Sequence, residues 1–315
     1  MSEKAMRAIS QDVLGGAEVL KVTELERPEP GVGEVLVRVS AAGVNPIDWK
    51  TREQGAFLGR PPFVLGWDVS GVVEAVGLGV RMFEPGDEIY GMPLFPAEAG
   101  AYAEYVAAPA RHFAVKPTGL SHVQTAALPL AALTARQALV DVGRLHPGQR
   151  VLIHGGAGGV GHLAVQIASA LGAHVIATGR GAKHQTLREL GADELIDFTQ
   201  VDVNATVREV DFVLDTLGGR NTFETLATLK DGGTLVSLPG PDENAVIPEA
   251  AKRGIKAGFM LVQPDRTGLL EINELVKSGK LRPLIQQDFP LEQAADAHRL
   301  GENGSTLGKI VLTVA

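Results

Sequence analysis

The sequence has no cysteine among its 315 residues. Disulfides, thiolate nucleophiles and every cysteine-ligated zinc site are therefore excluded. Aromatic residues make up only 5% of the chain, and no segment approaches the roughly 18 consecutive apolar residues of a membrane helix. The first residues also lack the apolar stretch of a secretory signal peptide, so we expect no membrane association and a cytoplasmic protein.

Basic residues are outnumbered, 29 Lys and Arg against 37 Asp and Glu, and the net charge is −8. A nucleic-acid partner is not expected, because binding to phosphates requires a basic surface. The hydrophobic content of 45% with 21% charged residues is typical of a folded globular protein. At this length the chain can bury a full core and form two domains.

The first part of the chain has the pattern of a β-domain. Residues 34–39 (EVLVRV) alternate with a period of two, and residues 69–76 are rich in valine. Clusters of proline and glycine at residues 28–33 and 85–87 indicate turns. These features predict a small, irregular β-domain.

From about residue 119 the pattern changes to alternating helices and strands. Residues 125–140 and 160–171 have the apolar spacing of helices. Short apolar strands are predicted at residues 151–154, 174–178, 212–215, 234–238 and 255–262. This alternation predicts an α/β fold with a doubly wound parallel sheet.

The remaining tail is predicted to return to the β-domain, because the parallel sheet is already complete. It contains predicted helices at residues 267–278 and 291–300 and a strand at residues 309–314. The predicted domains are therefore a discontinuous β-domain (1–120 and 265–315) and a nucleotide-binding domain (121–264).

A glycine-rich loop gives the strongest functional signal. Residues 151–161 read VLIHGGAGGVG, in which three glycines form a G-x-G-x-x-G spacing between a strand and a helix. Such a loop brings the backbone close to a pyrophosphate at the positive end of the helix dipole. The alternative, a flexible turn, leaves the many glycines without a role. The residues predicted to bind the cofactor are Gly156, Ala157, Gly158, Gly159, Val160 and Gly161.

The charge after the second predicted strand distinguishes the two nicotinamide cofactors. An NAD site usually has an acidic residue there, whereas residues 142–188 contain no Asp or Glu. The strand instead ends in Thr178, Gly179 and Arg180, and Lys183 follows. These residues predict NADP(H), since Arg and Lys would hold its 2′-phosphate. Alternatively, Arg180 and Lys183 only solvate the start of a helix.

Several motifs together resemble the medium-chain dehydrogenases/reductases, in their zinc-free NADPH:quinone oxidoreductase branch. They are the glycine loop and residues 41–48 (AAGVNPID), 62–71 (PFVLGWDVSG), 85–87 (PGD), 100–106 (GAYAEYV) and 128–134 (LPLAALT). The resemblance implies a GroES-like β-domain built from both chain ends, a Rossmann domain between them and a cleft that joins the two. It also implies pairing of the last Rossmann strand, residues 255–262, across a homodimer.

The resemblance also implies that no metal takes part. Where the zinc branch has a Cys, this chain has Asn45, and where that branch has a His-Glu pair, it has Trp67 and Asp68. Carboxylates alone bind zinc poorly. Without a Lewis acid, hydride transfer to an electron-poor small molecule fits best, so we expect a quinone or a conjugated enone or 2-alkenal as acceptor.

The candidate catalytic residues are Asn45, Asp48 and Lys50. In the family this segment lies beside the nicotinamide, and its Asn faces the substrate. Lys50 stands where many members have a Tyr. On this hypothesis Asn45 orients the cofactor or substrate and Lys50 stabilises an oxyanion or donates a proton. Alternatively, Asn45 forms a turn and residues 48–50 are the solvated start of a helix.

Other positions follow from the resemblance and from the ends of the predicted strands. Asp215 follows the fourth strand and Leu238 and Pro239 the fifth, at the edge where such a sheet binds its ligand. Phe259 and Leu261 resemble a backbone contact to the carboxamide, and Phe198 stands where relatives place a Tyr over the adenosine. Tyr102 and Tyr105 are expected to be structural.

Two alternative functions remain open at this point. An enoyl-thioester reductase shares the chemistry, but the chain has no further basic tract for a coenzyme A phosphate. A non-catalytic NADP(H)-binding sensor or structural protein would keep the fold without the reaction.

Overall fold

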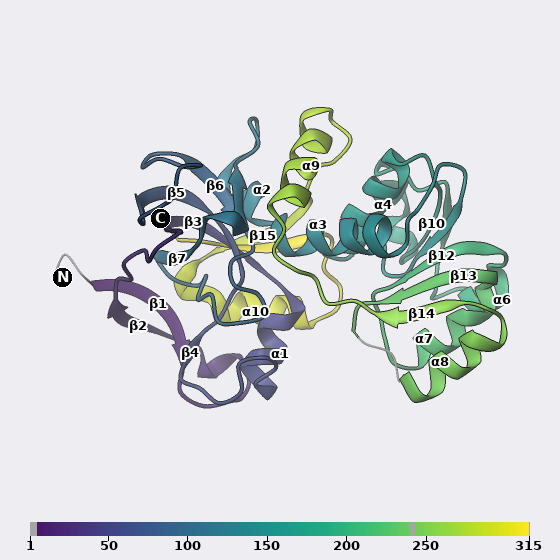
Figure 1. Cartoon of the computed structure of the whole chain (residues 1–315). Coiled ribbons are helices and arrows are strands. Elements are labelled where there is room, and N and C mark those ends of the chain that lie inside the picture. Colours follow the sequence, from purple (N-terminus) through teal and green to yellow (C-terminus); the bar gives the residue numbers. More distant parts are fainter. Residues whose placement is uncertain (1–4, 240–242, 315) are drawn as a thin grey trace. The chain divides into compact units, whose positions relative to one another are not determined.

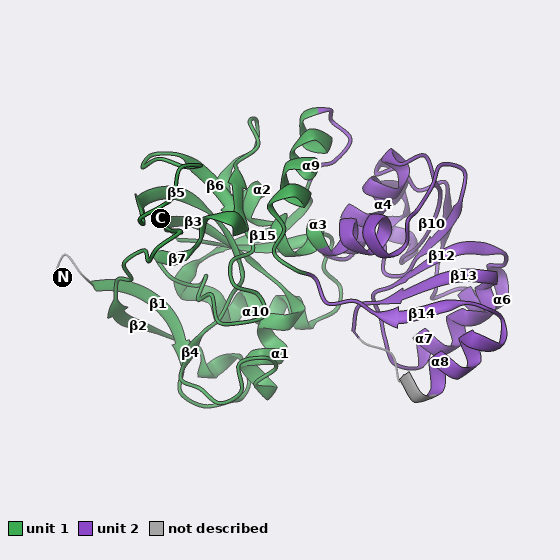
Figure 2. Ribbon diagram, in the orientation of Figure 1, with its two compact units in different colours: residues 1–133, 263–277, 283–315 green, residues 134–262, 278–282 purple. Residues whose placement is uncertain are grey.

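The computed structural model describes residues 5–239 and 243–314 (Figure 1). The chain divides into two compact units (Figure 2). Unit 1 comprises Met1–Leu133, Gln263–Lys277 and Pro283–Ala315, and unit 2 comprises Thr134–Val262 and Ser278–Arg282. Unit 1 is therefore discontinuous, but it extends beyond the predicted boundary at residue 120. The reason is that the helix after this boundary, α2 (His122–Ala126), packs on strands β3 and β5 of unit 1.

Unit 1 is built on two β-sheets, which agrees with the predicted β-domain. The small sheet has the order β2 (Lys21–Glu26), β1 (Ala5–Gln11), β4 (Phe63–Val64). The large sheet has the order β15 (Ile285–Pro290), β16 (Lys309–Thr313), β3 (Glu34–Val44), β5 (Asp68–Val76), β6 (Glu88–Gly91), β8 (Phe113–Val115), with β7 (Tyr105–Pro109) also on β3.

The tail of the chain returns to this large sheet, as predicted. Strand β16 runs antiparallel to β3 and places Ile310 opposite Val44. The structure adds β15, which the sequence pattern did not reveal because Ile285–Pro290 has mainly exposed polar side chains. Helices α9 (Arg266–Lys277) and α10 (Ala294–Glu302) match the two helices predicted in the tail.

The helix predicted at residues 125–140 is wrong as one element. The structure divides it into α2, α3 (Pro129–Arg136) and a π-helical segment, Gln137–Val142. Pro129 at the first position of α3 lacks the N–H that would continue the hydrogen-bond ladder of α2. Apolar spacing therefore identified helical conformation here but not the break.

Unit 2 contains a six-stranded parallel sheet with the Rossmann strand order. The order among the described residues is β11 (Glu194–Ile196), β10 (His174–Thr178), β9 (Arg150–Ile153), β12 (Val210–Asp215), β13 (Leu229–Ser237), β14 (Lys256–Phe259). The helices that connect these strands are α4 (Gly161–Ala170), α5 (His184–Glu189), α6 (Val203–Thr206), α7 (Arg220–Glu224) and α8 (Glu243–Lys252). The predicted α/β fold class is confirmed.

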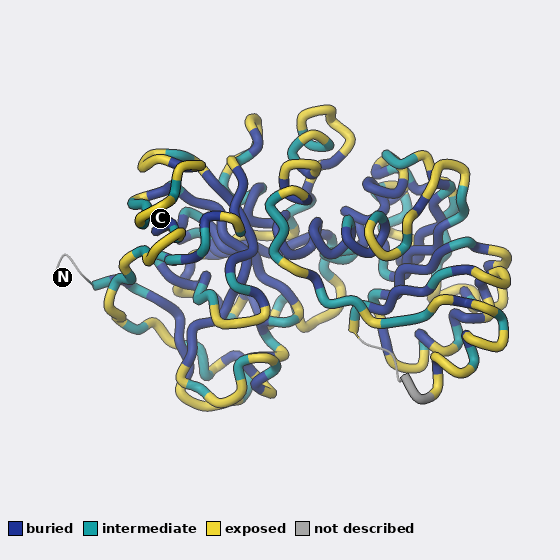
Figure 3. The backbone as a smooth tube through the Cα atoms, in the orientation of Figure 1, coloured by how far each residue is buried: buried dark blue, intermediate teal, exposed yellow. Residues whose placement is uncertain are grey.

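The interior of each unit follows its central strands, whose backbone is drawn as buried in Figure 3. In unit 2, strand β9 lies between β10 and β12, and its Val151, Leu152 and Ile153 are fully buried. Both faces of such a strand are covered by helices, which explains its continuous apolar sequence. Within the described ranges, no helix combines the length and the apolar character needed to cross a membrane.

Candidate functional site

The glycine loop of unit 2 is tied to the end of β10. After β9 ends, Gly155 adopts a φ of +61°, which favours glycine. Its N–H donates to the Thr178 hydroxyl at 3.0 Å, and the Gly156 N–H donates to the Thr178 carbonyl at 2.9 Å. Thr178 is 1% exposed. Thr178 therefore stabilises the conformation of the glycine loop through these two hydrogen bonds.

The three glycines of the motif have different surroundings. A Cβ at Gly161 would lie 2.1 Å from the Gly155 carbonyl oxygen, and one at Gly156 would lie 2.9 Å from the Ala177 Cβ. Both positions therefore require glycine for packing. A Cβ at Gly158 would meet only the Gly155 carbonyl oxygen, at 3.3 Å. Gly158 is thus the position where a side chain would extend away from the protein.

The loop leads into the N-terminus of α4, a helix of ten residues. No acceptor among the described residues meets the backbone N–H groups of Gly159 and Val160. The first turn of α4 contains no acidic residue. Free N–H groups at the positive end of a helix dipole bind anions, so the loop fits a diphosphate.

Basic side chains follow the neighbouring strand β10. Arg180 is exposed, and its guanidinium carbon lies 5.7 Å from the centre of the Phe198 ring. Lys183 is half-buried, and burial together with the nearby charge of Arg180 lowers its pKa. The structure therefore brings Arg180, Lys183 and Phe198 to one end of the sheet.

Asp197 lies in the same region and was not predicted. It follows β11, and its carboxylate accepts the Gly181 N–H at 2.8 Å. Hydrogen bonds from Thr199 lower its pKa most strongly. The predicted preference for NADP(H) depended on the absence of acidic residues from 142 to 188, and Asp197 comes to this site from the next strand, outside that range.

Asp215 is fully buried at the end of β12 and holds the following loop together. Its carboxylate accepts hydrogen bonds from the backbone of Leu217 and Gly218 and from the side chains of Asn221, Thr222 and Ser237. These contacts use its oxygens, so any contact with a cofactor would come from the loop and not from the carboxylate.

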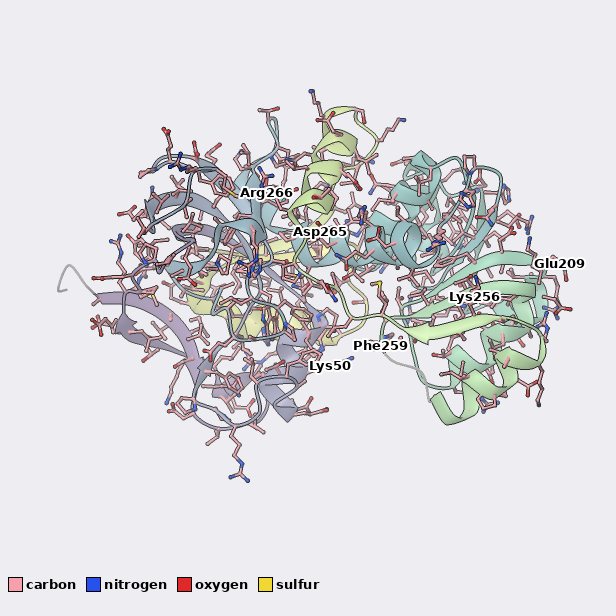
Figure 4. The ribbon with its side chains drawn as sticks, viewed as in Figure 1. Lys50, Glu209, Lys256, Phe259, Asp265 and Arg266 are labelled. Atoms are coloured by element: carbon pink, nitrogen blue, oxygen red, sulfur yellow. The ribbon has the colours of Figure 1, made fainter. Side chains whose placement is uncertain are left out.

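The other predicted cofactor residues of unit 2 lie near the ends of β10, β13 and β14. Gly179 packs so closely that a Cβ would lie 2.9 Å from the Leu187 side chain. Leu238 and Pro239 directly follow β13, and the Leu238 N–H donates to the Asp215 carbonyl at 2.9 Å. Phe259 ends β14 and is labelled in Figure 4. The residue is 45% exposed, and Leu261 follows it.

In unit 1, Asn45 and Asp48 begin helix α1 (Pro46–Gln54). The Asp48 carboxylate accepts the Asn45 N–H at 2.7 Å and the Tyr102 hydroxyl at 2.9 Å. Asp48 is fully buried, and burial raises its pKa to about 7. These contacts favour a capping role for Asp48 over direct contact with a substrate. Tyr102 is itself fully buried, which favours the predicted structural role.

The Asn45 side chain is enclosed by a buried ion pair. Its Nδ2 donates to Asp68 Oδ2 at 2.8 Å, and its Oδ1 accepts a hydrogen bond from Lys309. Lys309 Nζ also donates to the Val44 carbonyl at 2.9 Å and lies 3.4 Å from Asp68 Oδ2. The other Asp68 oxygen accepts the Leu130 N–H at 2.6 Å. Sequence reasoning missed Lys309, although a lysine at the start of an apolar strand was a signal.

Lys50 differs from these residues because it is exposed on α1 (Figure 4). A charged side chain that reaches solvent can approach a substrate, and it gives up part of its hydration when it does so. The structure thus separates the three predicted catalytic residues into two buried ones, Asn45 and Asp48, and one exposed cation.

The residues at the zinc positions do not fit a zinc ion. Asn45 and Asp68 are engaged with each other and with the ammonium of Lys309, which a cation would have to displace. In the part of the chain that the structure describes, no group of three or more His, Cys, Asp or Glu residues could hold a metal ion. The expectation of a metal-free site stays a prediction.

Comparisons with known proteins agree with this arrangement. Residues 31–118 match the alcohol dehydrogenase GroES-like domain, and residues 190–312 match the zinc-binding dehydrogenase family. A mitochondrial NAD(P)H oxidoreductase of Mus musculus is 35% identical over 96% of this chain and 88% of its own length. The chloroplastic NADPH-dependent alkenal/one oxidoreductase of Arabidopsis thaliana is 34% identical over 98% of this chain and 80% of its own length.

Among solved structures, the quinone oxidoreductase from Coxiella burnetii is similar with a TM-score of 0.93. It is 38% identical, and the match covers 99% of this chain and all of that one. The chain therefore belongs to the medium-chain dehydrogenase/reductase superfamily, in its quinone oxidoreductase-like branch. It is an NAD(P)H oxidoreductase of that branch.

Proposed function

We propose that this protein transfers a hydride from NADPH to a quinone or to a conjugated enone or 2-alkenal, without a metal. The observation that carries the proposal is the glycine loop, in which the N–H groups of Gly159 and Val160 have no acceptor among the described residues, next to Arg180 and Lys183. Relatives named for quinones and for alkenals support the choice of acceptor.

The residues that would hold the cofactor divide by chemistry. Gly159 and Val160 present backbone N–H groups to a diphosphate, while Arg180 and Lys183 pair with a 2′-phosphate. When bound, the reduced nicotinamide supplies the hydride. The other predicted contacts of unit 2, including Phe198, Leu238, Pro239, Phe259 and Leu261, stay part of this proposal.

The polar groups of unit 1 stabilise the small molecule that accepts the hydride. Negative charge develops on the carbonyl oxygen of a quinone or enone as it is reduced, and donors near that oxygen stabilise it. Asn45 and Lys50 are the proposed donors, and Asp48 positions Asn45 through the hydrogen bond to its N–H.

A homodimer through β14 is also proposed, since β14 is an edge strand of its sheet. The cytoplasmic location stays a prediction.

Steady-state oxidation of NADPH with a panel of acceptors tests the proposed function. We expect turnover with quinones or conjugated enones, and none with saturated ketones, because an isolated carbonyl is a poorer hydride acceptor without a Lewis acid. Turnover confined to enoyl-thioesters would assign the alternative reductase. NADPH binding without turnover of any acceptor would support the non-catalytic alternative.

Replacing Lys50 by Met tests the proposed donor on α1. The variant keeps the side-chain stem and removes the charge, so it separates packing from electrostatics. We expect kcat to fall on the order of 100-fold, the scale of one lost oxyanion donor, with unchanged NADPH affinity and melting temperature. Lys277→Met, at an exposed position of α9, is the matched control. A kcat for Lys50→Met within about twofold of the wild type would leave Lys50 as a solvated helix residue.

A further inference from the structure

The ion pair around Asn45 is buried to an unusual degree for charged residues. Asp68, Asn45 and Lys309 are 0%, 1% and 2% exposed, respectively. Removing an ammonium and a carboxylate from water costs several kcal/mol each, so such groups are retained only with good partners. Here the strand β16 brings Lys309 to Asn45 over a separation of 264 residues.

Every hydrogen of the Lys309 ammonium has an acceptor within reach. The three acceptors are the carbonyl of Val44, the amide oxygen of Asn45 and the carboxylate of Asp68. The Asp68 carboxylate is equally engaged, because its two oxygens accept from Leu130, Asn45 and Lys309. The polar atoms of Asp68, Asn45 and Lys309 therefore satisfy one another and their backbone neighbours, except for one N–H of the Asn45 side-chain amide.

This geometry leaves only one orientation for the Asn45 amide. An ammonium can only donate and a carboxylate can only accept, so Oδ1 must face Lys309 and Nδ2 must face Asp68. Nδ2 carries two hydrogens, and among the described residues only Asp68 accepts one of them. The second N–H is left for a ligand, whereas the amide oxygen is occupied.

We propose that Asp68 and Lys309 are positioning residues that fix the Asn45 amide, so that Asn45 offers a hydrogen-bond donor and not an acceptor to the reacting carbonyl. The inference rests on the proposed function, in which Asn45 serves the acceptor. A donor is the group that a carbonyl oxygen needs as it gains negative charge. An amide in the opposite orientation would present a lone pair and repel that charge.

The variant Asp68→Asn removes the acceptor that the Asn45 Nδ2 has now. The Leu130 N–H requires an oxygen from residue 68, as Asp68 Oδ1 provides now. The new amide nitrogen would then face the Asn45 Nδ2, so that two donors meet while Lys309 still binds the Asn45 oxygen. Lys309→Met removes the group that holds Oδ1, so Asn45 can turn its oxygen toward residue 68 only when both substitutions are present. Each single variant also leaves one buried charge without its partner, which destabilises the fold by itself.

The double variant Asp68→Asn/Lys309→Met separates the two effects, because it removes both charges of the ion pair together. We expect its melting temperature to recover relative to Lys309→Met. We also expect its kcat to stay on the order of 100-fold below wild type, with the NADPH dissociation constant within about twofold of wild type. The control is Asp211→Asn/Lys230→Met, which removes an ion pair of unit 2 and should keep full kcat. A double variant with wild-type kcat would overturn the proposal, since the pair would then serve only charge balance.

A second measurement does not depend on turnover. With ¹⁵N-labelled asparagine, the Asn45 side-chain amide gives two proton signals, assigned by their loss in Asn45→Ser. We expect one strongly shifted signal, from the proton bound to Asp68, and its disappearance in Asp68→Asn. Two rapidly averaging signals in the wild type would overturn the proposal. If the wild type reduced no acceptor, the proposed function would fail, while this spectrum would still test the amide orientation.

Discussion

Gly158→Val is expected to lose NADPH binding while the protein stays folded. A side chain at this position meets only the Gly155 carbonyl oxygen, at 3.3 Å, and it therefore extends toward the space above the loop. There it would separate a diphosphate from the N–H groups of Gly159 and Val160. Two lost hydrogen bonds to a charged group, at about 1.5 kcal/mol each, weaken binding by more than about 100-fold.

The comparison with Gly161→Val makes this test specific. A Cβ at Gly161 would lie 2.1 Å from the Gly155 carbonyl oxygen and 2.8 Å from the Gly156 Cα, so the loop itself must move. We expect Gly161→Val to lower the melting temperature and Gly158→Val to leave it nearly unchanged. Fluorescence titration with NADPH and thermal unfolding of both variants provide the measurements. Wild-type affinity in Gly158→Val would place the cofactor elsewhere.

The sequence predicted elements well where one periodicity covered the whole element. The apolar strands β9, β10 and β12 and helix α4 lie within two residues of the predicted ranges. The three-residue strand β11 and the exposed strand β15 had no such pattern. The break of the predicted helix at Pro129 depended on a single missing N–H, which apolar spacing does not record.

In the candidate site, features made by neighbouring residues in the sequence were predictable, and features made by distant residues were not. The glycine loop and the basic residues after β10 are contiguous in sequence, and their roles could be read from spacing and charge. The environment of Asn45 could not be predicted in this way, because Asp68 and Lys309 reach Asn45 from two other strands. Burial of Asp48 was equally hidden, since a carboxylate at the start of a helix is usually exposed.

Arg180→Ala/Lys183→Ala is expected to remove the preference for NADPH over NADH. NADPH differs from NADH only in its 2′-phosphate, so the loss of both cations should weaken NADPH alone. At about 1.5 kcal/mol for each charged hydrogen bond, the affinity falls by about 3 kcal/mol, or roughly 150-fold. The lower end of the range is appropriate because Arg180 is exposed and solvent screens its charge.

The charge of Asp197 and a control variant decide how the result of this titration is interpreted. Asp197 lies beside this loop and repels a 2′-phosphate, so the cations must also offset its charge before they produce a preference. Arg188→Ala/Lys252→Ala removes the same net charge from exposed positions of unit 2 and controls for general electrostatics. Calorimetric titration of both cofactors into all three proteins gives the dissociation constants. A wild-type protein that binds NADPH and NADH equally would show that Asp197 cancels the basic pair, and the choice of NADPH would then be wrong.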